Sequence, residues 1–303
     1  MTMPSFFAWV GEGWMVWRRL ILSLLLPLST LSALAQETAP EMLPEIIVQA
    51  PGERAVENFV GDVLDRVHGD QLARWHQPIC TTLRGFSAAQ AQAFDRRLQE
   101  AATQVGMEPP RSGCKPNAVI LLTDQPNMLI DHMLSTYPGI FAPAGPSEVR
   151  RELAAGGTVR VWSTSVTNGA QGTTPDIATK GSAVFTSVKL APGNATRLGS
   201  GVRADLFRTV VILDVNGLRG LPLDATADHV AMRLLGRTGE AEQTGVPTIL
   251  SLFRTDGGPR PLAMTDWDRA LLRELYRAPV TANADRQRRQ IARRLTDTAA
   301  AQP

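Results

Sequence analysis

Few residues in this chain have the types and spacing that catalysis needs, and the histidines are the scarcest of them. The sequence contains four: His68, His76, His132 and His229. No two of them lie four residues apart and the pattern HExxH does not occur, so no single helix offers the pair of imidazoles that holds a catalytic zinc ion. We therefore expect no metal site and no cofactor.

Two aspartates close to one of these histidines are the other candidates for chemistry. Asp224 and Asp228 stand four residues apart at the start of a predicted helix, so they could form a carboxylate pair for acid–base catalysis. The alternative is that their charges stabilise the helix N-terminus. If the protein is a hydrolase centred on His229, with Asp228 as a second candidate, we expect this histidine in an exposed cleft with acidic neighbours. A binding protein would keep it buried or solitary.

The segment from His229 to Gly236 follows the zinc-binding pattern HExxHxxG in part. His229 and Gly236 are in place, but Val230 stands where the pattern has its Glu and Arg233 where it has its second His. Gly239 occupies the position of the third ligand. Valine transfers no proton, and arginine would place a fixed positive charge beside the metal.

Two downstream segments extend this pattern. Residues 247–250 occupy the place of a Met-turn, and the T/S-x-x-D-x-x-x-L-x-x-L-Y pattern is matched by Thr265, Asp268, Leu272, Leu275 and Tyr276. Together, residues 206–277 resemble a zincin, of the matrixin-type metzincin kind. The resemblance implies a zincin-like scaffold, and the substitutions imply that its metal chemistry is lost. A capping box and an ordinary apolar helix face would explain part of the second pattern equally well.

The N-terminal residues have the features of an export signal. Arg18 and Arg19 precede an apolar run over residues 20–28, and the small residues Ala33 to Ala35 form an A-x-A cleavage site. We expect cleavage after Ala35 and a periplasmic or secreted protein. An uncleaved membrane anchor is the alternative, although the uncharged stretch is shorter than the roughly 20 residues of a spanning helix. Translation could begin at Met1, Met3 or Met15.

Cysteine count and charge fit an exported protein. Removal of residues 1–35 leaves 29 basic and 28 acidic residues from the 31 and 29 of the whole chain, so the mature protein is nearly neutral. That balance gives no field for nucleic acid. Both cysteines, Cys80 and Cys114, lie in the exported part, which indicates one disulfide in an oxidising compartment. Two separate buried thiols are the alternative.

Most of the mature chain resembles a family of exported proteins of unknown function from sphingomonad-type alphaproteobacteria. The segments that carry this likeness are residues 48–51, 73–76 leading to Cys80, 113–117, 247–250 and 275–276. The likeness favours export and the disulfide, and it implies no substrate.

Apolar periodicity and turn residues indicate one α+β domain over residues 53–280, after a flexible leader at 36–52 and before a basic helical tail at 281–303. Helices are expected at 56–67, 87–105, 128–133, 225–236, 265–277 and 283–297. Ser87 with Gln90 resembles a capping box for the second and Asp124 is expected to cap the third. The apolar face of the first is expected to comprise Val56, Phe59, Val60, Val63, Leu64 and Val67. A strand is expected at 117–123. Residues 159–166, 183–190 and 206–215 are expected to form an antiparallel sheet, so the fold is a mixed or antiparallel sheet flanked by helices.

These observations favour a non-catalytic binding or scaffolding protein of the bacterial envelope, with a peptidase-like hydrolase as the alternative. The expected partner is another envelope protein, contacted through the loops at 169–179 and 192–201. A basic cluster in the last helix could contact an anionic membrane surface or could be a solvated helix end; it comprises Arg286, Arg288, Arg289, Arg293 and Arg294.

Overall fold

The computed structural model describes residues 51–64, 71–169, 176–180, 183–187, 201–239, 241 and 245–300. The expected signal peptide with its cleavage site, residues 36–50 of the leader and His68 lie outside this part of the chain, as do most residues of the two expected binding loops. Within the described part, no helix is long and apolar enough to cross a membrane.

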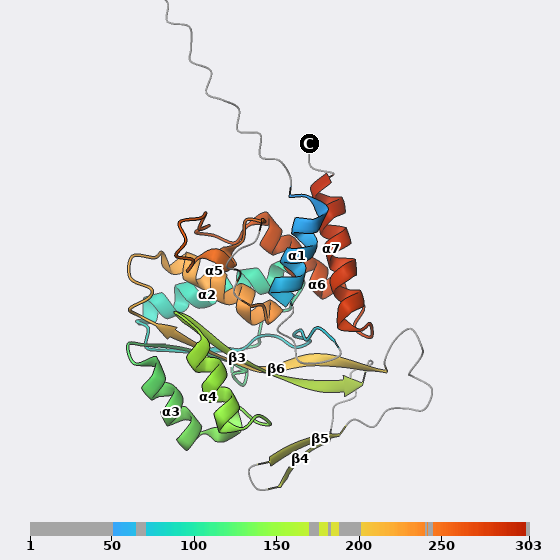
Figure 1. Ribbon diagram of the computed structural model, residues 1–303. Coiled ribbons are helices and arrows are strands. Elements are labelled where there is room, and N and C mark those ends of the chain that lie inside the picture. Colours follow the sequence, from blue (N-terminus) through green and yellow to red (C-terminus); the bar gives the residue numbers. More distant parts are fainter. Residues whose placement is uncertain are drawn as a thin grey trace, which may run out of the picture. The chain divides into compact units, whose positions relative to one another are not determined.

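A four-stranded mixed sheet forms the centre of the fold (Figure 1). Its strands are β1 (Thr81–Arg84), β2 (Ala118–Thr123), β3 (Val159–Gly169) and β6 (Val202–Asp214), in the order β1-β2-β6-β3. β1, β2 and β6 run parallel, and β3 is antiparallel to β6. The expected α+β class, a mixed sheet flanked by helices, is confirmed.

The expected antiparallel sheet of three middle segments is wrong in two respects. β5 (Ala183–Ser187) does not join the main sheet, because it pairs with β4 (Asp176–Lys180) in a separate two-stranded sheet. β6 pairs with β2 in parallel, and parallel neighbours need a long crossover, which a short-range apolar pattern does not reveal. β1 was not expected either, since its four residues contain a single large apolar side chain and are too few to show a strand pattern.

The larger core lies between one side of the sheet and five helices of the described part. These are α1 (Glu53–Leu64), α2 (Ala88–Gln104), α5 (Leu223–Gly236), α6 (Asp266–Arg277) and α7 (Ala284–Ala300). Val56, Phe59, Val60 and Val63 form the predicted buried face of α1. The capping box of α2, Ser87 with Gln90, is present as predicted. Local sequence rules therefore hold for these helices.

The helices α3 (Pro126–Thr136) and α4 (Pro146–Ala155) cover the opposite face of the sheet (Figure 1). A smaller core lies between them and that face. Trp162, Val210 and Ile212 supply the strand side of this core. Asp124 does not cap α3, so that expectation is wrong. The cap position belongs to Gln125, whose side chain makes no capping bond, because Pro126 occupies the first helical position and needs no N–H partner.

α5 is the central helix, and each of its residues from Ala225 to Gly236 is buried. A helix buried on all sides is normally apolar throughout, but this one contains Asp228, His229 and Arg233. Buried polar groups need hydrogen-bond or ionic partners. The partners of these side chains decide what α5 can do.

The expected disulfide is present and joins Cys80, before β1, to Cys114, before β2. Asn117 reinforces the junction: its side-chain carbonyl accepts from the Cys80 backbone N–H, and its amide nitrogen donates to the Pro78 carbonyl. The bond thus fixes the short edge strand β1 to the segment that leads into β2.

Candidate functional site

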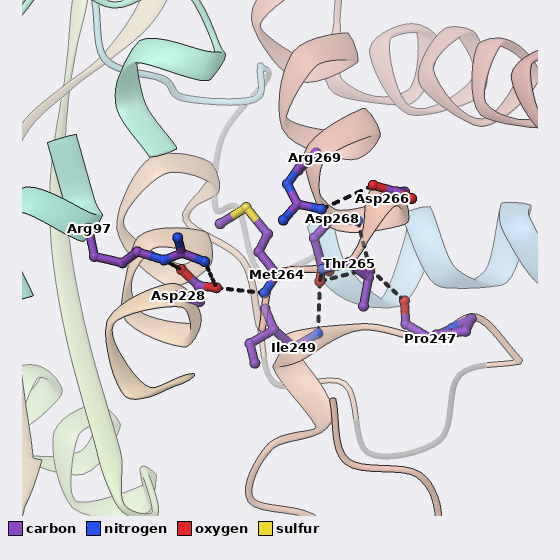
Figure 2. Close-up of polar contacts among 9 residues, drawn as sticks. All are labelled: Arg97, Asp228, Pro247, Ile249, Met264, Thr265, Asp266, Asp268 and Arg269. Atoms are coloured by element: carbon purple, nitrogen blue, oxygen red, sulfur yellow. Dashed lines mark hydrogen bonds and ion pairs between the residues drawn. The ribbon is translucent and has the colours of Figure 1, made fainter. Parts of the chain in front are cut away.

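The carboxylate of Asp228 is fully engaged in holding helices together (Figure 2). Arg97 of α2 donates to it through Nε at 2.6 Å and through Nη2 at 2.8 Å, and the Met264 backbone N–H donates at 2.7 Å. The Asp228 side chain is 2% exposed, whereas that of Arg97 is 33% exposed. This carboxylate therefore joins α2, α5 and the segment before α6. Asp224, the other expected member of a carboxylate pair, is exposed in the first turn of α5.

His229 is completely buried beside Asp228. Its Nδ1 lies 3.1 Å from the Ile249 carbonyl oxygen, and its ring meets the ring of Phe253 edge-on at 4.9 Å. Burial, reinforced by the charge of Arg233, lowers the pKa of His229 to about 3, although the Ile249 carbonyl acts in the opposite direction. The imidazole is therefore neutral at physiological pH, with its Nδ1 proton directed at Ile249. Its Nε2 has no hydrogen-bond partner among the described residues.

The other two positions implied by the zincin resemblance are also part of the packed structure. Arg233 is buried one helical turn beyond His229, and the backbone N–H of Gly239 donates to the Val63 carbonyl at 2.9 Å. In the described part of the chain, no group of three or more His, Cys, Asp or Glu side chains is placed to hold a metal ion.

Asp268 is the second buried carboxylate of this region, and it accepts bonds from two segments (Figure 2). The Ile249 N–H donates at 2.8 Å, while Thr265 donates through both its N–H and its hydroxyl. The Thr248 hydroxyl also donates to this carboxylate, at 2.5 Å. Burial raises the pKa of Asp268, and these bonds act against the increase. The capping box expected at Thr265 is present, and the same Asp268 carboxylate also fixes the turn at residues 247–250.

The three segments that carry the zincin resemblance therefore contact one another. His229 of α5 binds the Ile249 carbonyl, and Asp268 of α6 binds the N–H of the same residue. The Tyr276 hydroxyl donates to the Leu235 carbonyl at 3.1 Å, which joins the far ends of α5 and α6.

A shallow hollow beside Asp228 is too small for a substrate. It is lined by Arg97, Glu100, Ala101, Gln104, Asp228, Met264 and Arg269, and its volume of about 10 Å³ holds one water molecule. Arg97 is occupied by Asp228, and Arg269 forms an ion pair with Asp266. The hollow offers room for a water molecule and little else.

A different histidine has the exposed position that His229 lacks. His76 Nδ1 lies 2.7 Å from Asp205 Oδ1, and its side chain is 23% exposed. Arg203 and Asn168 also donate to Asp205. Burial raises the pKa of Asp205, but its bonds with His76, Asn168 and Arg203 outweigh burial, and the pKa is lowered. Sequence reasoning missed this group, because Asp205 stands one residue before the strand expected at 206–215 and His76 is distant in the sequence.

The remaining described histidine, His132, lies exposed on α3. Its Nδ1 is 3.5 Å from the Thr136 hydroxyl, and its ring meets Tyr137 edge-on.

Comparison of the chain with models of protein families, with curated proteins and with solved structures gave no match. Any function must therefore be argued from the geometry described above.

Proposed function

We propose that this chain is an exported protein of the bacterial envelope that binds a partner protein, on a degenerate zincin-like scaffold that carries out no catalysis. The observation that carries the proposal is the burial of His229. A catalytic imidazole must reach the substrate or the attacking water, and this one is enclosed by Phe253, the Ile249 carbonyl and the rest of α5. Because its pKa is low, the His229 imidazole is neutral near pH 7 and cannot act there as a protonated acid.

The contacts among α5, the turn at residues 247–250 and α6 support the scaffold part of the proposal. Where the resemblance places a general base, Val230 is part of the apolar core, and Arg233 stands where a second imidazole would bind metal. The interactions that would hold such a site together remain, through Asp268 and Ile249. The residues that would perform its chemistry are replaced.

The disulfide supports the export part of the proposal. Disulfides persist in oxidising compartments and are rare in the cytosol. Cys80 and Cys114 are bonded to each other, and the described part of the chain has no free cysteine.

An exposed aromatic patch after α3 suits a protein partner. Tyr137 is 54% exposed and Phe207 is 38% exposed. Arg208 lies over the Phe207 ring at 5.5 Å and donates to the carbonyls of Gly139 and Ile140, so it links Phe207 to the turn that follows Tyr137. Tyrosine, phenylalanine and arginine are enriched at protein interfaces, and tyrosine and arginine also at their energetic hot spots.

The absence of catalysis is tested on mature protein purified from the periplasm. We expect no stoichiometric metal, a melting temperature that a chelator does not change, and no hydrolysis of a peptide library above a buffer blank. Near-stoichiometric zinc, together with a loss of several degrees on chelation, would overturn the proposal. So would hydrolysis that a His229→Gln variant with native circular dichroism abolishes.

The binding role is tested by site-specific photocrosslinking in cells. A photoreactive residue at Tyr137 is expected to give one adduct of defined mass, which a Phe207→Ser substitution abolishes. The matched control places the probe at Leu262, an apolar side chain of 55% exposure outside the patch. Equal adducts at both positions, or none at Tyr137, would contradict a specific partner at this patch.

A further inference from the structure

A second exposed surface, on α6 and α7, has a different chemical character. Six exposed arginines lie on these two helices: Arg273, Arg277, Arg286, Arg289, Arg293 and Arg294. The helices pack against each other, and Glu274 of α6 pairs with Arg294 of α7 at 3.0 Å. We call these six residues the α6–α7 basic surface.

The spacing along α7 directs three of these arginines away from the protein. Gln287, Ile291 and Leu295 recur every four residues and are buried at 0–1% exposure. Since a helix turns about 100° per residue, Arg286, Arg289 and Arg293 fall on the opposite side. The flanks of α7 are covered, because Arg288 reaches the Leu64 carbonyl of α1 on one side and Arg294 reaches α6 on the other.

Acidic groups offset part of this surface, since the neighbouring helix α1 carries the exposed Glu53, Glu57 and Asp62. α7 contains five arginines against Asp285 and Asp297, and Asp285 already pairs with Arg288. Between the two helices, Glu274 is 11% exposed and is shared by Arg277 and Arg294. Arg289 and Arg293 form no ion pair with a described residue. The whole chain carries a formal charge of only +2. Because α7 holds five arginines and two aspartates, the remainder of the chain has no net positive charge.

The surface also lacks the features of a protein-binding site. The large apolar side chains exposed in the described residues are Met128, Tyr137, Phe207 and Leu262, and none of them lies on α6 or α7. Protein interfaces are anchored by buried aromatic or apolar residues. Guanidinium groups without such anchors suit phosphate groups, whose oxygens accept paired N–H bonds from arginine. A lipid surface carries many mobile phosphates, so it can meet arginines at different spacings.

We infer that the α6–α7 basic surface binds the headgroups of an anionic phospholipid bilayer, holding the protein at the membrane by charge and without insertion. This binding is separate from the proposed partner site at Tyr137. Each arginine near an anionic bilayer contributes about a fivefold gain in partitioning, and the attraction weakens as salt screens it.

The test is sedimentation of the mature protein with vesicles of phosphatidylcholine, with and without 30 mol% phosphatidylglycerol. We expect binding to the anionic vesicles at 50 mM salt, none to neutral vesicles, and loss of binding at 300 mM salt. A variant with Arg286→Gln, Arg289→Gln and Arg293→Gln should bind roughly 100-fold more weakly. Its melting temperature should stay near that of the wild type, because all three side chains are exposed.

The matched control removes the same charge elsewhere, with Arg84→Gln, Arg111→Gln and Arg151→Gln, all exposed and outside α6 and α7. This variant should lose less than about threefold in binding. Equal losses in both variants would mean that net charge alone acts and would overturn the inference. Binding to neutral vesicles, or no vesicle binding while an acidic protein crosslinks at position 289, would also overturn it.

Discussion

Asp268 and Asp205 are both buried carboxylates, yet the two regions hold them with different kinds of donor. Asp268 accepts only from neutral groups, two hydroxyls and two backbone N–H groups, and burial raises its pKa. Asp205 is held by His76, Arg203 and Asn168, and these bonds lower its pKa against burial. The first arrangement fixes a turn in the interior, whereas the second joins β6 to β3 and to the segment before β1. The two carboxylates therefore make stability depend on pH in opposite directions.

Removing the interior carboxylate should have the largest effect on stability. Asp268→Ala leaves the N–H groups of Ile249 and Thr265 and the Thr248 hydroxyl without their acceptor, so we expect a loss of about 3–5 kcal/mol in the free energy of unfolding. Urea denaturation followed by circular dichroism measures it. Asp266→Ala, on the same helix and 90% exposed, is the control and should cost less than about 0.5 kcal/mol. Similar losses for both would show that Asp268 does not fix the turn.

Asp228→Ala should rank second, with a loss of about 2–3 kcal/mol. The Met264 N–H loses its acceptor inside the protein, but Arg97 can turn to solvent because its side chain is 33% exposed. Glu100 pairs with the same arginine at 3.5 Å and is half exposed, so Glu100→Ala should change stability by less than about 0.5 kcal/mol. If Asp228→Ala instead stabilised the protein, its carboxylate would serve function and not packing.

His229 should make the protein acid-sensitive. Its pKa is 6.5 when unfolded and about 3 in the folded protein, so between these values the unfolded chain binds a proton that the folded chain does not. The contribution of the neutral imidazole to stability is therefore complete above pH 6.5. Below that value the free energy of unfolding decreases as the pH falls, by up to about 1.4 kcal/mol per pH unit. Urea denaturation at several pH values should show a shallower slope for His229→Gln than for the wild type, with a substitution of the exposed His132 by Gln measured alongside as the control. An unchanged slope in the first variant would mean that water reaches the imidazole.

Asp205 should have the smallest effect, of about 1 kcal/mol. Because its folded pKa is lowered from 3.8, its contribution is present above that value and is lost as pH falls through the folded pKa. Asp205→Asn should therefore destabilise the protein at pH 7 and have little effect once the pH lies below the folded pKa of Asp205. Asp131→Asn, at an exposed pair with Arg150, is the control.

The pH dependence that Asp268 gives to stability has the opposite sign, since its raised pKa favours the folded state at low pH.

Local rules predicted much of this fold from the sequence. The capping boxes at Ser87 and Thr265 and the buried face of α1 depend on residues within a turn or two of one another, and all are present. The disulfide followed from a count of two cysteines.

Features that depend on distant residues could not be predicted in this way. The partner of Asp228 is Arg97, 131 residues away, and only the packing of α2 on α5 brings them together. The parallel pairing of β2 with β6 and the burial of His229 depend on the same kind of long-range packing. The pattern around His229 predicts that this residue lies in a helix, but it does not predict that the helix is buried in the core.

The burial of α5 from Ala225 to Gly236 also governs how this sequence can evolve. Each position from Ala225 to Gly236 has neighbours on every side, and at Gly236 even a methyl group would come within 2.7 Å of the Thr238 side chain. The outer face of α7 has no such restriction, so its residues can change while the fold stays the same. Among diverged descendants of a common ancestor, α5 should therefore keep its sequence longest and provide the best segment for finding remote relatives.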